Sequence, residues 1–113
     1  MLDPRDIAVM KVMAISDRGT KRDFIDLYWY CKHVEPLVEV LRRVHKQYRN
    51  GVNWNYNHII RSLVYFDDAI DDPMPTMHIP VTWAQTTRFF RSETPRLSKY
   101  FLHIPVTPLP LTE

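Results

Sequence analysis

Glycine is scarce in this sequence. Gly19 and Gly51 stand alone in 113 residues, against nine prolines. A loop that cradles phosphates with backbone N–H groups needs several glycines close together, so a glycine-rich phosphate loop is excluded. The prolines concentrate late, in DDPMPTMHIP and HIPVTPLPLTE. Because proline interrupts helices, this distribution predicts that helices come first and irregular chain comes last.

The sequence also has a single cysteine, no long apolar run and little net charge. Cys31 is the single cysteine, which forbids an internal disulfide and argues against a zinc knuckle. No apolar run approaches the ~20 residues of a membrane span, and the start MLDPRD does not resemble a signal peptide. We therefore expect a cytoplasmic protein. The formal net charge of +2 is too small to indicate nucleic-acid binding by itself.

The pattern of apolar residues predicts an all-α fold, with about five helices in a compact bundle. Apolar side chains recur at helical spacing, and no segment has the pattern of a strand of confident length. We expect one helical domain over residues 1–102, followed by an irregular, proline-rich tail over 103–113. The expected helices lie at 4–18, 20–33 and 36–50, then from a cap at Asn55 or Asn57 through Phe66, and from 82 onward.

Residues typical of helix ends mark several of these boundaries. Asp3-Pro4 is a common helix start. Gly19 predicts a helix end in the left-handed conformation. Capping boxes are predicted at Thr20 with Asp23 and at Thr82 with Gln85. Pro95 is expected either to kink the last helix or to begin a new one.

The second predicted helix is apolar on nearly every side. Its polar positions form one stripe of Arg22, Asp26, Tyr30 and His33. Helices with so narrow a polar stripe are usually buried on most sides. The ionisable stripe is therefore expected to face a partner, a cleft or water.

A charged cluster surrounds the turn at Gly19. It contains Lys11, Arg18, Arg22, Asp23 and Asp26. If the two helices fold back antiparallel, Lys11 and Asp26 lie level, because they are eight and seven residues from the glycine. One interpretation is an ion-pair network that joins the helices. The other is a site in which the cations hold phosphates and a carboxylate orients a nucleophile or metal.

Other candidate sites have simpler interpretations. The acidic residues Asp67, Asp68, Asp71 and Asp72 follow the fourth helix, and a solvated helix end is favoured over Mg²⁺ binding. The five histidines lack metal-ligand spacing. Core packing is favoured over base stacking for Trp54, Tyr56 and Trp83. A DNA-binding helix-turn-helix around Gly19 is disfavoured, because its second helix is too apolar to lie in a groove.

The charged cluster also carries a family resemblance. The segment LDPRDIAVMKVMAISDRGTKRDFIDLYWY resembles the C-terminal stretch of the AbiEii/AbiGii-type nucleotidyltransferases, the toxins of type IV toxin–antitoxin systems. The later segments IIRSLVYFDDAIDDPMP and VTWAQTTRFF look like the continuation of the same domain. The resemblance extends from Leu2 to Glu93.

The resemblance implies roles for individual residues. Lys11 would counter the charge of a nucleoside triphosphate, with the nearby Arg18 and Arg22. Asp26, with Asp23 beside it, would orient or deprotonate the acceptor group. The family holds Mg²⁺ through paired aspartates that follow a Gly-Ser motif in an N-terminal α/β domain. This sequence has no Gly-Ser dipeptide, and we expect it to lack that domain. We therefore expect no metal ligands and no cofactor in the chain alone, and use of Mg²⁺ and a triphosphate only beside a catalytic half.

The resulting functional hypothesis is the helical C-terminal part of a nucleotidyltransferase-like toxin, inactive alone. It would be a split subunit or a remnant, with a separately encoded catalytic half or an antitoxin as partner, or with a second copy bound through exposed apolar helix faces. The alternative is a non-enzymatic binding or dimerisation module that contacts RNA, nucleotide or a protein. A structural protein with an ion-pair network is the third option.

Overall fold

The computed structural model describes residues 3–48, 56–76 and 80–102. Within these ranges the elements are all helices: α1 (Pro4–Arg18), α2 (Lys21–His33), α3 (Leu37–Tyr48), α4 (Tyr56–Ser62) and α5 (Trp83–Leu102). The all-α prediction is confirmed. The predicted irregular tail, 103–113, lies outside the described residues. None of the described helices is long and apolar enough to cross a membrane.

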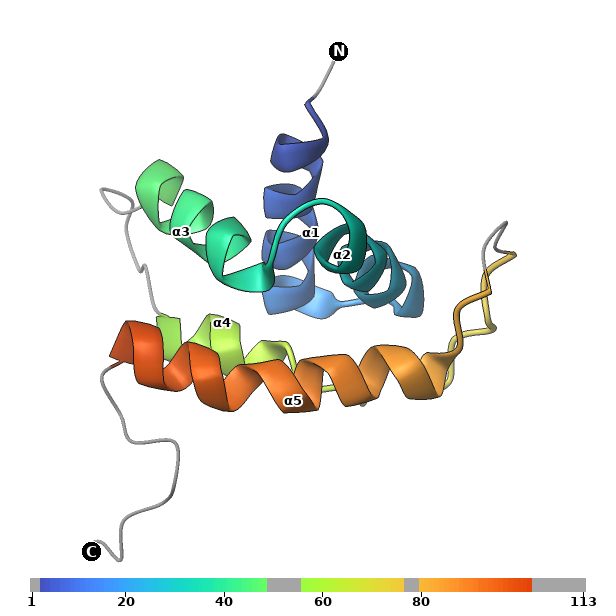
Figure 1. Ribbon diagram of the computed structural model, residues 1–113. Helices are drawn as coiled ribbons and strands as arrows, with labels where there is room; N and C mark the ends of the chain where they lie inside the picture. The colour runs from blue at the N-terminus through green and yellow to red at the C-terminus, as the bar shows by residue number, and fades with distance from the viewer. Residues whose placement is uncertain (1–2, 49–55, 77–79, 103–113) are drawn as a thin grey trace, which may run out of the picture.

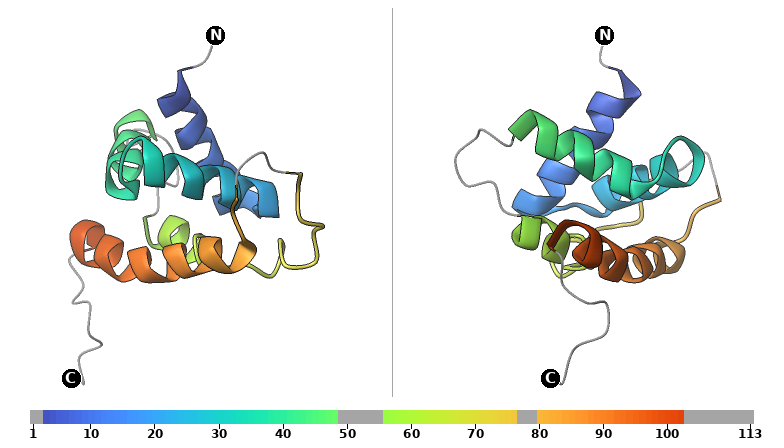
Figure 2. Two further views of the ribbon diagram at one scale, coloured as in Figure 1. Left: turned by 45° about the vertical axis from the view of Figure 1, so that its right-hand side comes forward. Right: turned by 60° about the vertical axis from the view of Figure 1, so that its left-hand side comes forward.

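The helices are arranged in two layers (Figure 1). Helices α1, α2 and α3 form the upper layer of that view, and α4 and α5 lie side by side beneath them. Helix α1 contacts both α2 and α3 and reaches α4 with its C-terminal end, while α2 packs on α5. Figure 2 shows from two further sides that α2 crosses α1 obliquely after the turn. The two helices are therefore not antiparallel along their length.

The core lies between these layers. Helix α3 contributes its inward face, where Leu37, Val40, Leu41 and Val44 are completely buried. Below α2, the rings of Phe24, Phe66, Trp83 and Phe90 meet edge to face, and Phe24 lies 5.1–5.8 Å from each of the other three. Tyr56 stacks on Phe101 at 4.5 Å. The core interpretation of Trp83 and Tyr56 is thus confirmed, and Trp54 lies outside the described residues.

The predicted helix starts are confirmed by their hydrogen bonds. Asp3 Oδ1 accepts a bond from the Arg5 N–H at 2.8 Å. Thr20 and Asp23 bond reciprocally, each at 3.2 Å. Thr82 and Gln85 form the same box at the start of α5, with bonds of 2.9 and 3.1 Å. Local sequence signals therefore set where these three helices begin.

The backbone conformation of Gly19 differs from the prediction. Its φ of −73° and ψ of 134° are extended, so the expected left-handed conformation is wrong. The glycine is needed instead for close approach, because an added Cβ would lie 2.8 Å from Phe24 Cε2 and 3.3 Å from the Ile15 Cα. The absence of a side chain lets the Phe24 ring pack directly against the turn.

Other boundaries also differ from the prediction. Helix α4 ends at Ser62, and the residues that follow form turns, although Leu63 and Phe66 remain buried. These apolar residues pack on the core without helical backbone. Asn57 lies inside α4, so it is not the cap, and the alternative cap Asn55 lies outside the described residues. Helix α5 continues through Pro95, so no new helix begins there. The predicted end of α3 at residues 50–51 also lies outside the described residues.

The junction of α2 and α3 is held by a polar clip. Glu35 accepts hydrogen bonds from the Tyr30 hydroxyl and from both terminal nitrogens of Arg43. Tyr30 is only 8% exposed, so the predicted polar stripe of α2 is interrupted at this residue. Burial and the bond to Glu35 raise the pKa of Tyr30 to about 12. Hydrogen bonds from Arg43 lower the pKa of Glu35 below its ordinary 4.5, despite the opposing effect of burial.

We predict that Gly19→Ala destabilises the protein by about 1–3 kcal/mol, the usual cost of overpacking. The buried Phe24 ring and the Ile15 backbone cannot both move away from the new methyl group. The measurement is urea unfolding of Gly19→Ala in the wild-type and Phe24→Leu backgrounds. Leucine lacks the atom that the methyl group meets, so the cost should be smaller in that background. Equal costs in both would contradict this explanation.

We predict a pH dependence from the Glu35 clip. A carboxyl group whose pKa is lower in the folded state stabilises the protein above its unfolded pKa, and this contribution is lost as pH falls through the folded pKa. Glu35→Gln should therefore be less stable than wild type at pH 7, and the difference should narrow as pH falls below about 4. Thermal unfolding between pH 3.5 and 7 measures this. Glu39→Gln, at an exposed ion pair with Arg42, is the control and should show little effect.

Candidate functional site

The charged cluster predicted around Gly19 assembles where α2 crosses α1. Lys11 Nζ lies 3.1 Å from Asp23 Oδ1 and 3.2 Å from Asp26 Oδ2. Arg22 Nε lies 3.5 Å from the same Asp26 oxygen. The Lys11, Asp23 and Asp26 side chains are 16–30% exposed, while Arg22 is 58% exposed. The predicted meeting of Lys11 and Asp26 is confirmed, and the oblique crossing is close enough for the lysine stem to span it.

The start of α2 positions the carboxylates. One carboxylate oxygen of Asp23 accepts a hydrogen bond from the Thr20 N–H in the capping box, and the other accepts one from Lys11 Nζ. Its side chain therefore has little freedom. Asp26 lies almost one helical turn further along, on the same side of α2. The capping box thus fixes the helix start and one wall of the site together.

Lys11 is held in its charged form. Burial lowers the pKa of Lys11, but hydrogen bonds and charge from Asp23 and Asp26 more than offset this, and the net pKa lies above the ordinary 10.5. The ammonium group is a fixed positive charge at neutral pH. Two carboxylates already contact it, so a phosphate group that binds Lys11 must compete with them or arrive with a cation that engages them.

Arg18 does not join this group. It is exposed at the end of α1 and makes no ion pair with any residue that the structure describes. The structure therefore brings together four of the five sequence-predicted site residues: Lys11, Arg22, Asp23 and Asp26. Their chemical roles stay predictions.

An apolar hollow of about 190 Å³ borders the charged cluster. Lys11 and Asp26 line it together with residues from the first turns of α1 and the second half of α2, including Ile7, Trp29 and Tyr30. Ile7 and Trp29 are 42% and 37% exposed, and Met10 nearby on α1 is 54% exposed. Exposed apolar faces on helices were expected from the sequence, but this hollow was not.

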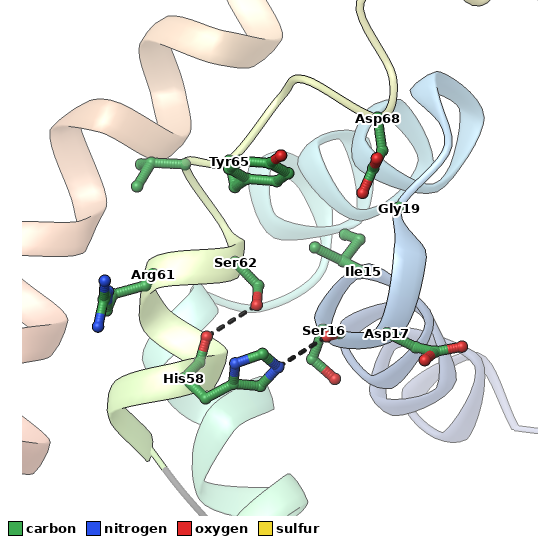
Figure 3. A pocket seen from close by; sticks show the side chains of 10 residues that line it. Ile15, Ser16, Asp17, Gly19, His58, Arg61, Ser62, Tyr65 and Asp68 are labelled. Carbon is green, nitrogen blue, oxygen red and sulfur yellow. Dashed lines mark hydrogen bonds between the residues drawn. The ribbon is translucent and has the colours of Figure 1, made fainter.

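A second, larger hollow of about 580 Å³ lies at the opposite end of α1 (Figure 3). Ser16, Asp17 and Gly19 line it from one side, and α4 and the turn after it line the other. His58 Nε2 lies 2.8 Å from the Ser16 carbonyl oxygen, which ties α4 to the last turn of α1. This histidine therefore makes a structural contact between the two helices.

The acidic run differs from its prediction in two ways: it lies in the turns beyond the end of α4 at Ser62 instead of at a helix end, and one of its residues is not solvated. Asp67, Asp68 and Asp71 are exposed, but Asp72 Oδ2 accepts the backbone N–H of Lys21 at 3.0 Å. Asp72 therefore caps the start of α2 from 51 residues away, instead of being a solvated helix end. Among the described residues, no group of three His, Cys, Asp or Glu side chains is placed to hold a metal ion.

Comparisons with known proteins identify a family. Residues 1–104 match the family described as "Nucleotidyl transferase AbiEii toxin, Type IV TA system". The chain belongs to this family. Uncharacterized protein aq_aa25 of Aquifex aeolicus (strain VF5) is 40% identical over 88 residues. The match covers 77% of this chain and 40% of that relative, so the chain spans less than half of the relative's length. No solved structure matches significantly.

We predict that Lys11→Met lowers the free energy of unfolding by about 1–2 kcal/mol, because it leaves two neighbouring, half-buried carboxylates without their hydrogen-bonded cation. Arg22→Met should change it by no more than about 0.5 kcal/mol, since that pair is exposed. Urea unfolding at pH 7 compares the two variants. Similar losses from both would show that the contacts of Lys11 contribute no more than a surface pair.

Proposed function

We propose that this chain forms the helical wall of a nucleotide-transfer site in an AbiEii-type toxin, and that a metal-binding half completes the site. The observation that carries the proposal is the position of Lys11. It lies between Asp23 and Asp26, beside an apolar hollow that is open to solvent. Membership of the nucleotidyltransferase toxin family supports this assignment. Alone, the chain would be inactive, either as a split subunit or as a remnant.

We assign each side chain of the cluster a role that matches its charge. Lys11 counters charge on the triphosphate, and Arg22 and Arg18 supply further positive charges on the same two helices. Asp26, the more exposed of the two carboxylates, orients or deprotonates the acceptor group. Asp23 is occupied by the capping box and by Lys11, so its part is to hold Lys11 in place.

Magnesium does not fit the described residues of this chain alone. Both carboxylates of the cluster already contact the Lys11 ammonium group, and no third acidic or imidazole side chain stands with them. We therefore place the Mg²⁺ ligands of the complete site in the other half, and derive no step through the metal from these residues.

The apolar hollow supplies the proposed contact with that half. Ile7, Met10 and Trp29 are exposed beside Lys11, and large apolar side chains grouped at one place are typical of protein interfaces. A segment covering them would exclude water from the ion-paired cluster and strengthen its electrostatics. An antitoxin or a second copy of the chain bound at this face would compete with the catalytic half.

The test is complementation. The chain is mixed with the N-terminal α/β half of an AbiEii-family protein, Mg²⁺, total RNA and each α-labelled nucleoside triphosphate, and transfer of label is measured. We expect transfer only when both parts are present. Lys11→Met and Asp26→Asn should each reduce it by roughly 10²-fold or more. Lys32→Met, at an exposed residue near the end of α2, should keep full activity.

Two outcomes would contradict the proposal. One is transfer that is unchanged in both Lys11→Met and Asp26→Asn. The other is salt-sensitive binding of short RNA hairpins by the chain alone, without triphosphate binding and without transfer in the mixture. That second result would assign the chain to the alternative class of a non-enzymatic binding module.

A further inference from the structure

A second set of contacts holds the first turn of α2 from the side away from Lys11. The Lys21 side chain is only 9% exposed. Its Nζ donates to the Asp72 carbonyl at 2.9 Å and the Ile70 carbonyl at 3.3 Å, and it lies 5.1 Å from the centre of the Trp83 ring. The Lys21 backbone N–H donates to Asp72 Oδ2 at 3.0 Å. We call these contacts the Lys21–Asp72 latch.

The Lys21 side chain makes hydrogen bonds that an apolar side chain of similar size could not make. Burying an ammonium group is costly unless every donor finds a partner. A methionine would fill a similar volume without that cost, but it could not bind the two carbonyl groups of the segment after α4. Trp83, below the lysine, belongs to the aromatic cluster with Phe24. The latch therefore joins α2, the segment after α4 and the start of α5 at one point.

The geometry of α2 relates this point to the charged cluster. At 3.6 residues per turn, Asp23 and Asp26 lie about 200° and 140° around the helix from Lys21. The two carboxylates thus face roughly away from the latch. A rotation of the first turn that releases Lys21 would also move both carboxylates relative to Lys11. Asp72 adds a further restraint, because it binds an N–H group that has no partner inside the helix.

We propose that Lys21 and Asp72 are positioning residues, which hold the first turn of α2 in the rotation that brings Asp23 and Asp26 to Lys11. The segment after α4 thereby belongs to the charged site, although it lies about 50 residues further along the chain. This inference goes beyond the proposed function and does not depend on it, since it concerns the geometry of Lys11 in the chain alone.

The experiment measures how readily the Lys11 amine reacts. An amine held by two carboxylates reacts slowly with an acetylating reagent, because less of it is uncharged. Each lysine is followed by mass spectrometry at pH 8 and 25 °C, with the exposed Lys46 and Lys99 as internal references. We expect Lys21→Met and Asp72→Ala to raise the rate at Lys11 about threefold or more, equivalent to half a pKa unit. The reference lysines should not change.

Each residue of the latch has a matched control of the same residue type. Lys32→Met and Asp71→Ala alter exposed side chains and should leave the rate at Lys11 unchanged. Thermal unfolding of every variant separates positioning from stability. A lower Tm with an unchanged Lys11 rate would overturn the proposal, because the latch would then be structural only. If Lys21→Met does not fold, Asp72→Ala decides the question, since it keeps the buried lysine and removes only the bond to its N–H.

Discussion

The first turn of α2 is the constraint on which the rest of the structure depends. Thr20 and Asp23 close the capping box, Phe24 packs against the bare backbone of Gly19, and Lys21 is held from the far side by the segment after α4. Each contact restrains the same turn in a different direction. Together they fix the path of α2 across α1 and its rotation, and these two quantities determine whether its carboxylates reach Lys11.

The pairing at Lys11 has consequences for any ligand. One lysine, one arginine and two carboxylates leave the cluster with no net charge, so it does not attract phosphates as a bare basic patch would. A triphosphate that binds here as proposed would have to take Lys11 from the aspartates. A structural ion-pair network and a nucleotide site are therefore compatible: the network keeps the side chains ordered until the ligand replaces its bonds.

The sequence predicted the features that depend on nearby residues. The capping boxes at Thr20 and Thr82 each follow from a spacing of three residues, and the meeting of Lys11 with Asp26 follows from their similar distances to Gly19 along the chain. The extended conformation of Gly19 was missed, because it results from the packing of Phe24 and not from a helix-end preference. Asp72 was missed for a similar reason, since no local signal shows that a carboxylate will cap a helix 51 residues earlier. The hollow beside Lys11 depends on how two helices cross, which the sequence pattern leaves open.

The position of that hollow limits how the site can be completed. Lys11 and Asp26 line it together with exposed apolar side chains of both helices, so the polar and the apolar surfaces share one opening. A partner that covers the apolar side chains also lies over the ion pairs and lowers the local dielectric constant around them. The binding energy of such a partner and the strength of the ion pairs at Lys11 are then linked, because burial of the same surface increases both. A small ligand alone would gain neither the buried apolar area nor the exclusion of water, so the proposed site would be completed by a protein segment and not by a small ligand alone.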